Sequence, residues 1–346
     1  MIRHIPRSAR SLFTIATTAF ALSLGGTAHA QANNMEAMFD RTLGTEVRAP
    51  QTYEARYDTA FEQQIARLAD GSNGRIGVYA IDLATGQDVG VLADHRFPLA
   101  STSKVAIAAT FLAGVDQGRW SLTNEFPLPG RGTYMSAQRH LELMISKSCN
   151  ACTDALLNAV GGPTAVNAYM QRIGITDFTL SRSIAALVRE DGDVDPATTI
   201  DVRDSATPRA MGRLLAGIHE GRWHTPRSRA VLMNAMKATT TGKKRMPSGL
   251  PMMADLAHKT GTLSRTASDI GIFRLPDGRT VAAAIYVTGQ SASMAAENGN
   301  RARKLEARRV RDGRIASITS ALYNGFARSS ANARNWANAQ YGNGGQ

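Results

Sequence analysis

The sequence predicts an α/β fold of the α+β type, in which both ends of the chain build one sheet and a helical lobe is inserted between them. Two observations support this. Strand patterns occur early in the chain, at 75–83 and 88–93 on either side of the turn residues 84–86, and they return around Lys259. The stretch between them, residues 100–221, is mainly helical in pattern. The sheet is therefore expected to combine strands from distant parts of the sequence.

The first thirty residues have the pattern of an export signal. Arg3, Arg7 and Arg10 give a basic start, residues 12–24 are apolar, and residues 28–30 form an A-x-A cleavage site. The apolar part is too short and too interrupted for a transmembrane helix. We therefore expect an exported, soluble, periplasmic protein without membrane insertion.

The remaining boundaries follow from composition. A helical apolar pattern covers 52–68, a C-terminal helix is expected to end at Phe326, and the last twenty residues are rich in Asn, Ala, Gly and Ser, which is typical of a disordered tail. The predicted organisation is a signal peptide (1–30), a leader (31–51), an α/β subdomain (52–94 and 222–326), an all-α subdomain (95–221) and a disordered tail (327–346).

The chain is basic, with 40 Lys and Arg against 28 Asp and Glu. Removing the signal removes three Arg and no acid, so the mature charge is 37 minus 28, or +9. Basicity can indicate nucleic-acid binding. The sequence has no basic patch interleaved with aromatic residues, and export argues against that role. We expect a solvated basic surface and no nucleic-acid partner.

Cys149 and Cys152 are the only cysteines. A C-x-x-C pair in an exported chain can form a disulfide or act in redox chemistry. No thioredoxin-like pattern surrounds this pair, so two packed side chains or a local disulfide are the simpler interpretations. The seven His have no metal-ligand spacing, and His258 is expected to be structural. We expect no metal and no cofactor.

Three short motifs carry the chemistry. They occur in the order S-x-x-K, S-x-N and K-T-G, each in a suitable local setting. The first opens an apolar run, 105–112, that predicts a buried helix and places Lys104 one turn after Ser101. The second precedes a helix, and the third precedes a strand-turn-strand pattern. The motifs are Ser101-Thr102-Ser103-Lys104, Ser148-Cys149-Asn150 and Lys259-Thr260-Gly261-Thr262.

With these motifs the sequence closely resembles the class A serine β-lactamase family, among the penicillin-recognising serine hydrolases. The resemblance covers residues 52–326. It implies an antiparallel five-stranded sheet flanked by helices, with an all-α lobe. Further matching segments are 95–98, 158–163, Arg203-Asp204 with Thr207-Pro208, and Thr240-Thr241-Gly242 with Arg245.

Each motif has an expected role in acyl transfer. Ser101 is the candidate nucleophile, and Lys104 can serve as its base if burial and a second cation, Lys259, lower its pKa. The resemblance implies an oxyanion hole from the backbone N–H groups of Ser101 and Thr262, and a proton passed by Ser148 to the leaving nitrogen. It also implies that Asn150 binds the substrate's amide side chain. The residues implied to hold the substrate carboxylate are Lys259, Thr260, Gly261, Thr262 and Arg245.

One part of the family pattern is missing. Class A enzymes hydrolyse the acyl-enzyme with a Glu-activated water, and that Glu lies in an R-x-E-x-x-L-N loop motif. Here the corresponding segment is 182–188, with Ile184 at the Glu position and Val188 at the Asn position. The loop is also longer than usual before Asp204. Glu190 and Asp191 lie in the extra stretch and could reach the site; Glu190 is the candidate deacylation base, with a solvated loop carboxylate as the alternative. Cys149 stands where the family has Asp.

Three functions remain open. The favoured one is a class A-type serine β-lactamase, acylated at Ser101, that opens the ring amide and deacylates slowly if no base replaces the Glu. The second is a D-Ala-D-Ala carboxypeptidase-like penicillin-binding protein. The third is a non-catalytic binder of β-lactams or cell wall. The partner is thus a β-lactam or a D-alanyl peptide, and a monomer is expected.

Overall fold

The computed structural model describes residues 47–48, 59–71 and 73–341. The predicted signal peptide lies outside the described residues. So does the predicted leader, apart from β1 (Val47–Arg48), which pairs antiparallel with β8 (Ile200–Asp201). Among the described residues, no helix is long and apolar enough to cross a membrane.

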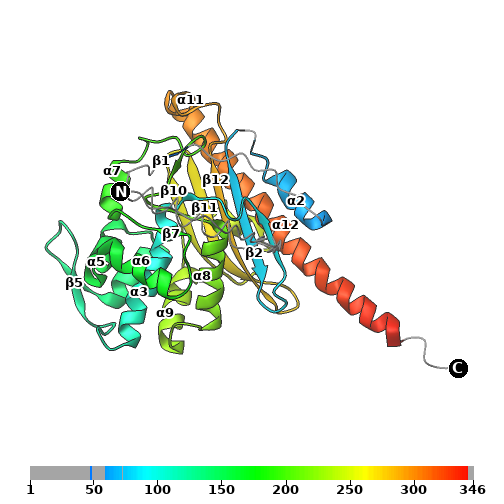
Figure 1. The fold of residues 1–346 in the computed structure, drawn as a ribbon, viewed down its shortest axis with the longest axis horizontal. Coiled ribbons are helices and arrows are strands. Elements are labelled where there is room, and N and C mark those ends of the chain that lie inside the picture. The colour runs from blue at the N-terminus through cyan, green and yellow to red at the C-terminus, as the bar shows by residue number, and fades with distance from the viewer. Residues whose placement is uncertain (1–46, 49–58, 72, 342–346) are drawn as a thin grey trace, which may run out of the picture. The chain divides into compact units, whose positions relative to one another are not determined.

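The centre of the fold is a five-stranded antiparallel sheet with strand order β10-β11-β12-β2-β3 (Figure 1). The two early strands are β2 (Ile76–Asp82) and β3 (Asp88–Val91). The three late strands are β10 (Leu256–Leu263), β11 (Thr266–Arg274) and β12 (Thr280–Thr288). The prediction of one sheet built from both parts of the chain is confirmed.

Alternation along β12 divides the hydrophobic core between the two faces of the sheet. Ala282, Ala284 and Tyr286 belong to the core that contains α8 (Pro208–Glu220) and the helical lobe. The side chains between them point to the other face, where they pack with helices α2 (Ala60–Leu68) and α12 (Arg301–Tyr341). Because both faces are covered, β12 is buried along nearly its whole length.

Helix α3 (Ser103–Asp116) is the centre of the helical lobe. Every residue from 103 to 114 is buried, as the run of apolar residues on all sides of this helix predicts. The helices in contact with it are α4 (Ala137–Ser146), α5 (Asn150–Val160), α6 (Gly162–Arg172) and α9 (Pro226–Lys237). Since α9 packs against α3 and α4, the lobe extends past the predicted boundary at residue 221.

Two predicted helix starts have the expected caps. Thr207 Oγ1 accepts a hydrogen bond from the N–H of Ala210 at 3.1 Å, and Pro208 follows as the first helical residue. Thr225 Oγ1 accepts from the N–H of Ser228 at 3.3 Å in the same way, before Pro226. These local signals therefore fix where α8 and α9 begin.

The remaining strands and helices are short. The strands are β4 (Phe97–Pro98), β5 (Glu125–Pro127), β6 (Tyr134–Ser136), β7 (Phe178–Thr179) and β9 (Ser205–Ala206). The helices are a 3₁₀ turn (Ala100–Thr102), α7 (Ile184–Arg189), α10 (Met246–Gly249) and α11 (Met294–Asn298). Strand β9 pairs with both β4 and β7, so the end of the long loop is attached directly before the Ser101 turn.

The C-terminal helix differs from its predicted length. Helix α12 (Arg301–Tyr341) continues past Phe326, where the buried apolar pattern ends. Residues 327–341, expected to be part of a disordered tail, are helical here. The low hydrophobicity of the segment suggested disorder, but five of its residues are Ala, the strongest helix former.

Candidate active site

Ser101 lies in a sharp turn that is held from both sides. Ala100 before it has a φ of 47°, in the left-handed region, and Ser101 is partly exposed in the 3₁₀ turn that leads into α3. Thr102 Oγ1 donates to the carbonyl of Leu99 at 2.5 Å and lies 3.0 Å from the hydroxyl of Tyr286 on β12. Ser103 Oγ donates to the carbonyl of Ala100 at 2.8 Å. The neighbours of Ser101 are thus buried and fixed, while Ser101 itself faces outwards.

Strand β10 packs closely against this turn because Gly261 has no side chain. A Cβ on Gly261 would lie 3.1 Å from both the Leu99 carbonyl oxygen and the Ala100 Cβ, and 2.4 Å from Ser268 Oγ. The Leu99 carbonyl belongs to the backbone and cannot move aside, and the contact with Ser268 Oγ would be too short without a shift of that side chain. The glycine of the K-T-G motif therefore lets Thr260 and Thr262 lie beside the nucleophile turn.

Lys104 is completely buried, and its amine is surrounded by oxygen atoms of the S-x-N motif. Nζ donates to the Ser148 carbonyl at 2.8 Å, to Ser148 Oγ at 3.1 Å and to Asn150 Oδ1 at 2.7 Å. Helices α3 and α5 pack together, and these contacts join their N-terminal ends. The structure thus brings the first two motifs together.

Lys259 reaches the same hydroxyl from the sheet. Its Nζ donates to Ser148 Oγ at 3.1 Å and to the carbonyl of Thr260 at 2.8 Å. The hydroxyl of Ser148 therefore lies between two amines, at 3.1 Å from each. A hydroxyl can both accept and donate, so this arrangement can carry a proton between the two sides of the site.

Both lysines are poised to titrate near neutral pH. The pKa of Lys104 is lowered to about 6, mainly by burial and also by the charge of Lys259, while the charge of Asp154 opposes the shift. Burial lowers the pKa of Lys259 to about 7, opposed by Asp269 and assisted by Arg245. An amine that is neutral near pH 7 can accept a proton, which is what a serine nucleophile requires.

Ser148 has a backbone conformation that the surrounding contacts must hold. Its φ is 57°, in the left-handed region that residues with a side chain seldom adopt. Such conformations persist where the structure around them fixes them, and they are common at functional sites. Here the Lys104 amine binds the Ser148 carbonyl, and the N–H of Cys149 donates to the Leu143 carbonyl at 3.1 Å.

Arg245 supports the K-T-G strand from behind. Its guanidinium donates to the carbonyls of Gly261 and Ser268 at 2.7 and 2.9 Å, and to Thr262 Oγ1 at 2.8 Å. Its Nε pairs with Asp312 of α12 at 2.7 Å. These contacts use four of the five N–H groups of an arginine. One N–H is left without a partner among the described residues, so Arg245 positions Thr262 and retains a single donor.

The segment before Arg245 packs on the same strand. Thr241 Oγ1 lies 2.6 Å from Thr260 Oγ1. Gly242 has a φ of 68°, and a Cβ there would lie 2.4 Å from Thr260 Cγ2, so a glycine is required. His258, next to Lys259, pairs with buried Asp269 at 2.9 Å, which gives it a structural contact within the sheet.

The long loop is attached at both of its predicted ends. Arg182 Nε donates to Asp204 Oδ2 at 2.5 Å, and this ion pair closes the loop. Ile184, which the sequence comparison aligned with the family's Glu, begins α7 and is buried. The two oxygens of Asp154 accept the backbone N–H groups of Ile184 and Ala185 at 2.7 and 3.0 Å.

Asp154 is a site residue that the sequence reasoning missed. It lies on α5 four residues after Asn150, and residues at this spacing share a helix face about 5–6 Å apart. Its carboxylate therefore links the start of α7 to the Lys104–Asn150 cluster, and its charge acts on Lys104. The signal in the sequence was an acid one helical turn after the Asn of S-x-N.

Glu190 lies at the opposite end of α7 from Ile184. Glu190 is six positions after Ile184 along the helix, a rise of about 9 Å. Its carboxylate accepts from Arg182 Nη1 at 2.6 Å and lies 3.7 Å from Arg203. The hydrogen bond from Arg182 holds the pKa of Glu190 below its usual value. Among the described residues its side chain contacts neither Lys104 nor Ser148, so the contacts do not support a role as deacylation base.

The inserted part of the loop is instead fastened to the turn after β10. Asp191 accepts the N–H of Ser264 at 2.7 Å, and Asp195 pairs with Arg265 at 2.9 Å. Ser264 and Arg265 form the turn between β10 and β11. Two of the extra acids thus serve to anchor the loop.

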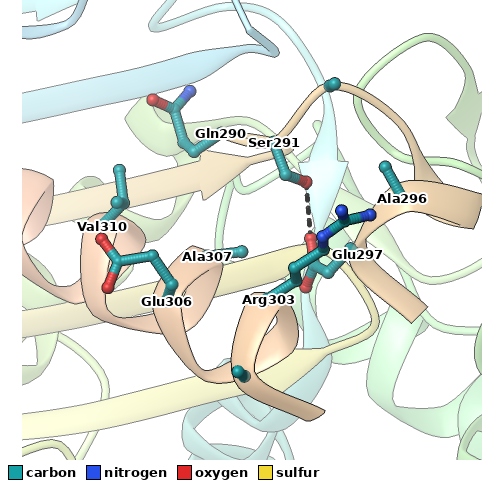
Figure 2. A pocket seen from close by; sticks show the side chains of 10 residues that line it. Gln290, Ser291, Ala296, Glu297, Arg303, Glu306, Ala307 and Val310 are labelled. Carbon is teal, nitrogen blue, oxygen red and sulfur yellow. Dashed lines mark hydrogen bonds between the residues drawn. The ribbon is translucent and has the colours of Figure 1, made fainter. Parts of the chain in front are cut away.

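A separate cavity of about 630 Å³ lies between α11 and the start of α12 (Figure 2). Ser291 Oγ donates to the buried carboxylate of Glu297 at 2.7 Å at its edge, and Arg311 pairs with Glu297 at 2.6 Å. None of the predicted site residues lines this cavity. Across the described part of the chain, no group of His, Cys, Asp and Glu has the arrangement of a metal site. The two buried lysines of the motifs instead meet at Ser148.

Comparison with known proteins agrees with this geometry. The family model described as "Beta-lactamase enzyme family" matches residues 60–325. Beta-lactamase SME-1 of Serratia marcescens is 27% identical over 253 residues, which are 68% of this chain and 84% of that protein. The carbapenem-hydrolyzing beta-lactamase KPC of Klebsiella oxytoca is 30% identical over 240 residues, 65% of this chain and 79% of that protein.

Solved structures give the same result. An ancestral class A β-lactamase is 31% identical with a TM-score of 0.66, over 77% of this chain and 99% of that one. A β-lactamase from Chitinophaga pinensis is 27% identical, also with a TM-score of 0.66, over 77% and 99%. The resemblance drawn from the three motifs is confirmed, and the chain belongs to the β-lactamase enzyme family, among its class A members.

Proposed function

We propose that this protein is a serine β-lactamase in which Ser101 is acylated by opening of the ring amide and the acyl-enzyme is hydrolysed slowly. The observation that carries the proposal is the buried Lys104 amine, held among oxygens of Ser148 and Asn150 one turn after Ser101. The named relatives act as β-lactamases, including carbapenem-hydrolyzing enzymes. The favoured first step is therefore attack of a serine on a β-lactam.

In the acylation step, neutral Lys104 takes the proton of Ser101 as its oxygen attacks the ring carbonyl. The backbone N–H groups of Ser101 and Thr262 stabilise the oxyanion. When the ring C–N bond breaks, the Ser148 hydroxyl passes a proton to the nitrogen and is itself reprotonated from the neighbouring amines. The two 3.1 Å contacts of Ser148 support this transfer.

The substrate carboxylate binds at the K-T-G strand. Lys259 supplies positive charge, Thr260 and Thr262 supply hydroxyl groups, and Gly261 allows the close approach of the strand. Arg245 holds Thr262 and adds its one remaining N–H. Asn150, whose Oδ1 accepts from Lys104, has its amide nitrogen for the substrate's acyl side chain.

Slow deacylation is expected because of the residue that begins α7. Deacylation needs a group that removes a proton from water, and the side chain here is the apolar Ile184. Asp154 lies close by, but both of its oxygens bind backbone N–H groups. Hydrolysis therefore lacks a dedicated base on this loop.

The chemistry fits an exported protein. The substrates of this family act on the cell wall, which lies outside the cytoplasm, and residues 1–30 have the pattern of a cleavable signal. The location that we propose is the periplasm, with the mature chain acting as a monomer.

Replacing the nucleophile tests the first step. With a chromogenic cephalosporin, the protein should give a rapid burst equal to the enzyme concentration and then slow turnover. Ser101→Ala should lose both phases, because no group is left to form the acyl-enzyme. Stopped-flow absorbance measures both. A burst that survives in Ser101→Ala would contradict the role of Ser101.

The pH dependence of kcat/KM tests the lysine pair. Acylation needs neutral Lys104, so kcat/KM should rise as the pH rises through about 6. Acylation also needs charged Lys259, so kcat/KM should fall as the pH rises through about 7. The two limbs belong to the coupled pair. Lys259→Arg keeps its charge and should remove the alkaline limb. An acid limb near the ordinary lysine value of 10.5 would contradict the mechanism.

Restoring a carboxylate at the start of α7 tests the slow step. Ile184→Glu should speed loss of the acyl-enzyme by about 10²–10⁴-fold, the usual contribution of a general base. Ile184→Gln is the matched control, with the same shape but no base, and should stay slow. The acyl-enzyme half-life, followed by intact mass, gives the answer for each variant.

Glu190→Gln completes this comparison. The substitution keeps the size of the side chain and an acceptor for Arg182, so deacylation should not change. If Glu190→Gln abolishes hydrolysis, Glu190 is the base and the account of Ile184 is wrong. Equal acyl-enzyme half-lives for Ile184→Glu and Ile184→Gln would also contradict the proposal that the missing base at residue 184 makes deacylation slow.

A further inference from the structure

The chain's two cysteines form a disulfide inside the motif that carries Ser148 and Asn150. Cys149 and Cys152 are bonded to each other, and the structure has no free cysteine among its described residues. Cys149 is the residue between Ser148 and Asn150, and Cys152 lies on the first turn of α5. The bond therefore spans the junction between the left-handed Ser148 and the helix that holds Asn150.

The side-chain cap at this helix start is weaker than usual. Cys149 occupies the N-cap of α5, where Ser, Thr, Asp and Asn are preferred because their oxygen accepts a backbone N–H. Here Cys149 Sγ accepts the N–H of Cys152 at 3.1 Å, and sulfur is a weak acceptor. The side-chain cap of α5 is therefore weak at the point where the backbone of Ser148 and Asn150 must be accurately placed.

The disulfide supplies a covalent link in its place. Cys152 is 1% exposed and belongs to the core of the helical lobe, and Cys149 packs against the same core. Thr153 Oγ1 donates to the Cys149 carbonyl at 2.7 Å and adds a second attachment. The bond thus ties the residue after Ser148 to a helix turn that is itself fixed in the core.

We propose that the Cys149–Cys152 disulfide positions Ser148 and Asn150 for acylation, and that a dithiol reductant slows acylation by opening it. The inference rests on the proposed function, since it concerns the step that Ser148 and Asn150 serve. Cys149 and Cys152 act here as positioning residues, because neither sulfur contacts Lys104 or Lys259 among the described residues.

The redox step balances with a dithiol. A thiolate of the reductant attacks the partly exposed Cys149 Sγ, the bond to Cys152 breaks, and the second thiol of the reductant releases Cys149. The protein gains two electrons and two protons as two thiols, and the reductant becomes a disulfide. Because so short a loop restricts the unfolded chain little, reduction should disturb this site more than the whole fold.

The experiment measures the acylation burst before and after reduction of the full protein with dithiothreitol. Alkylation followed by intact mass confirms that both thiols have formed, and near-ultraviolet circular dichroism confirms that the fold remains. Acylation should slow by about 10–100-fold, the scale of a displacement of about 1 Å in a catalytic group. The rate of acyl-enzyme loss should change less, because that step does not need a proton delivered to the leaving nitrogen.

Two variants separate positioning from a general loss of structure. Cys149→Ala with Cys152→Ala has neither a disulfide nor a side-chain cap, so it should acylate as slowly as the reduced protein and should not respond to dithiothreitol. Cys149→Asp with Cys152→Ala gives α5 a strong oxygen cap without a disulfide. This second variant should recover most of the acylation rate and should also ignore the reductant.

The outcomes are distinct. Equal acylation rates for the oxidised protein, the reduced protein and the double Ala variant would overturn the positioning role. So would a Cys149→Asp variant that acylates no faster than the double Ala variant while remaining folded. If the oxidised protein forms no acyl-enzyme at all, the proposed function fails first, and that result is recognised before any reductant is added.

Discussion

The site depends on two buried amines that share one hydroxyl group. Lys104 and Lys259 each approach Ser148 Oγ to 3.1 Å, one from the helical lobe and one from the sheet. Burial and mutual repulsion make it costly for both to be charged, because neighbouring charges interact strongly away from water. In the mechanism that we propose, Lys104 can therefore lose its proton near neutral pH and act as the base for Ser101. The arrangement requires α3, α5 and β10 to converge within hydrogen-bond distance.

The fold maintains this convergence by small residues and by contacts behind the site. Gly261 lets β10 lie against the Ser101 turn, and Arg245 binds the same strand from the other side. The junction at Ser148 is held by the disulfide and by the Lys104 amine. Asp154 connects this cluster to the long loop. These contacts fix the groups that we propose for acylation, whereas the loop begins α7 with Ile184, which the sequence comparison placed at the position of the family's base.

The order of the motifs predicted which segments come together more reliably than it predicted the contacts that support them. The structure brings Lys104, Ser148 and Lys259 of the three motifs within hydrogen-bond distance, and the Thr-Pro pairs predicted two helix starts. Asp154 was missed because its role depends on α7 packing against α5, a contact between segments thirty residues apart. The ion pair of Glu190 with Arg182 likewise depends on how the inserted loop folds. Helix α12 exceeded its expected length because polarity was weighed above the helix propensity of Ala.

The lifetime of the acyl-enzyme tests the central claim most directly, which is that this site forms the acyl-enzyme efficiently but lacks a base to hydrolyse it. Intact mass spectrometry after a short exposure to penicillin, followed by removal of free drug, measures that lifetime. The account predicts a stoichiometric adduct on Ser101 that forms quickly and is lost much more slowly than it formed. An adduct that never accumulates while penicillin is consumed rapidly would contradict it, because hydrolysis would then have an efficient base.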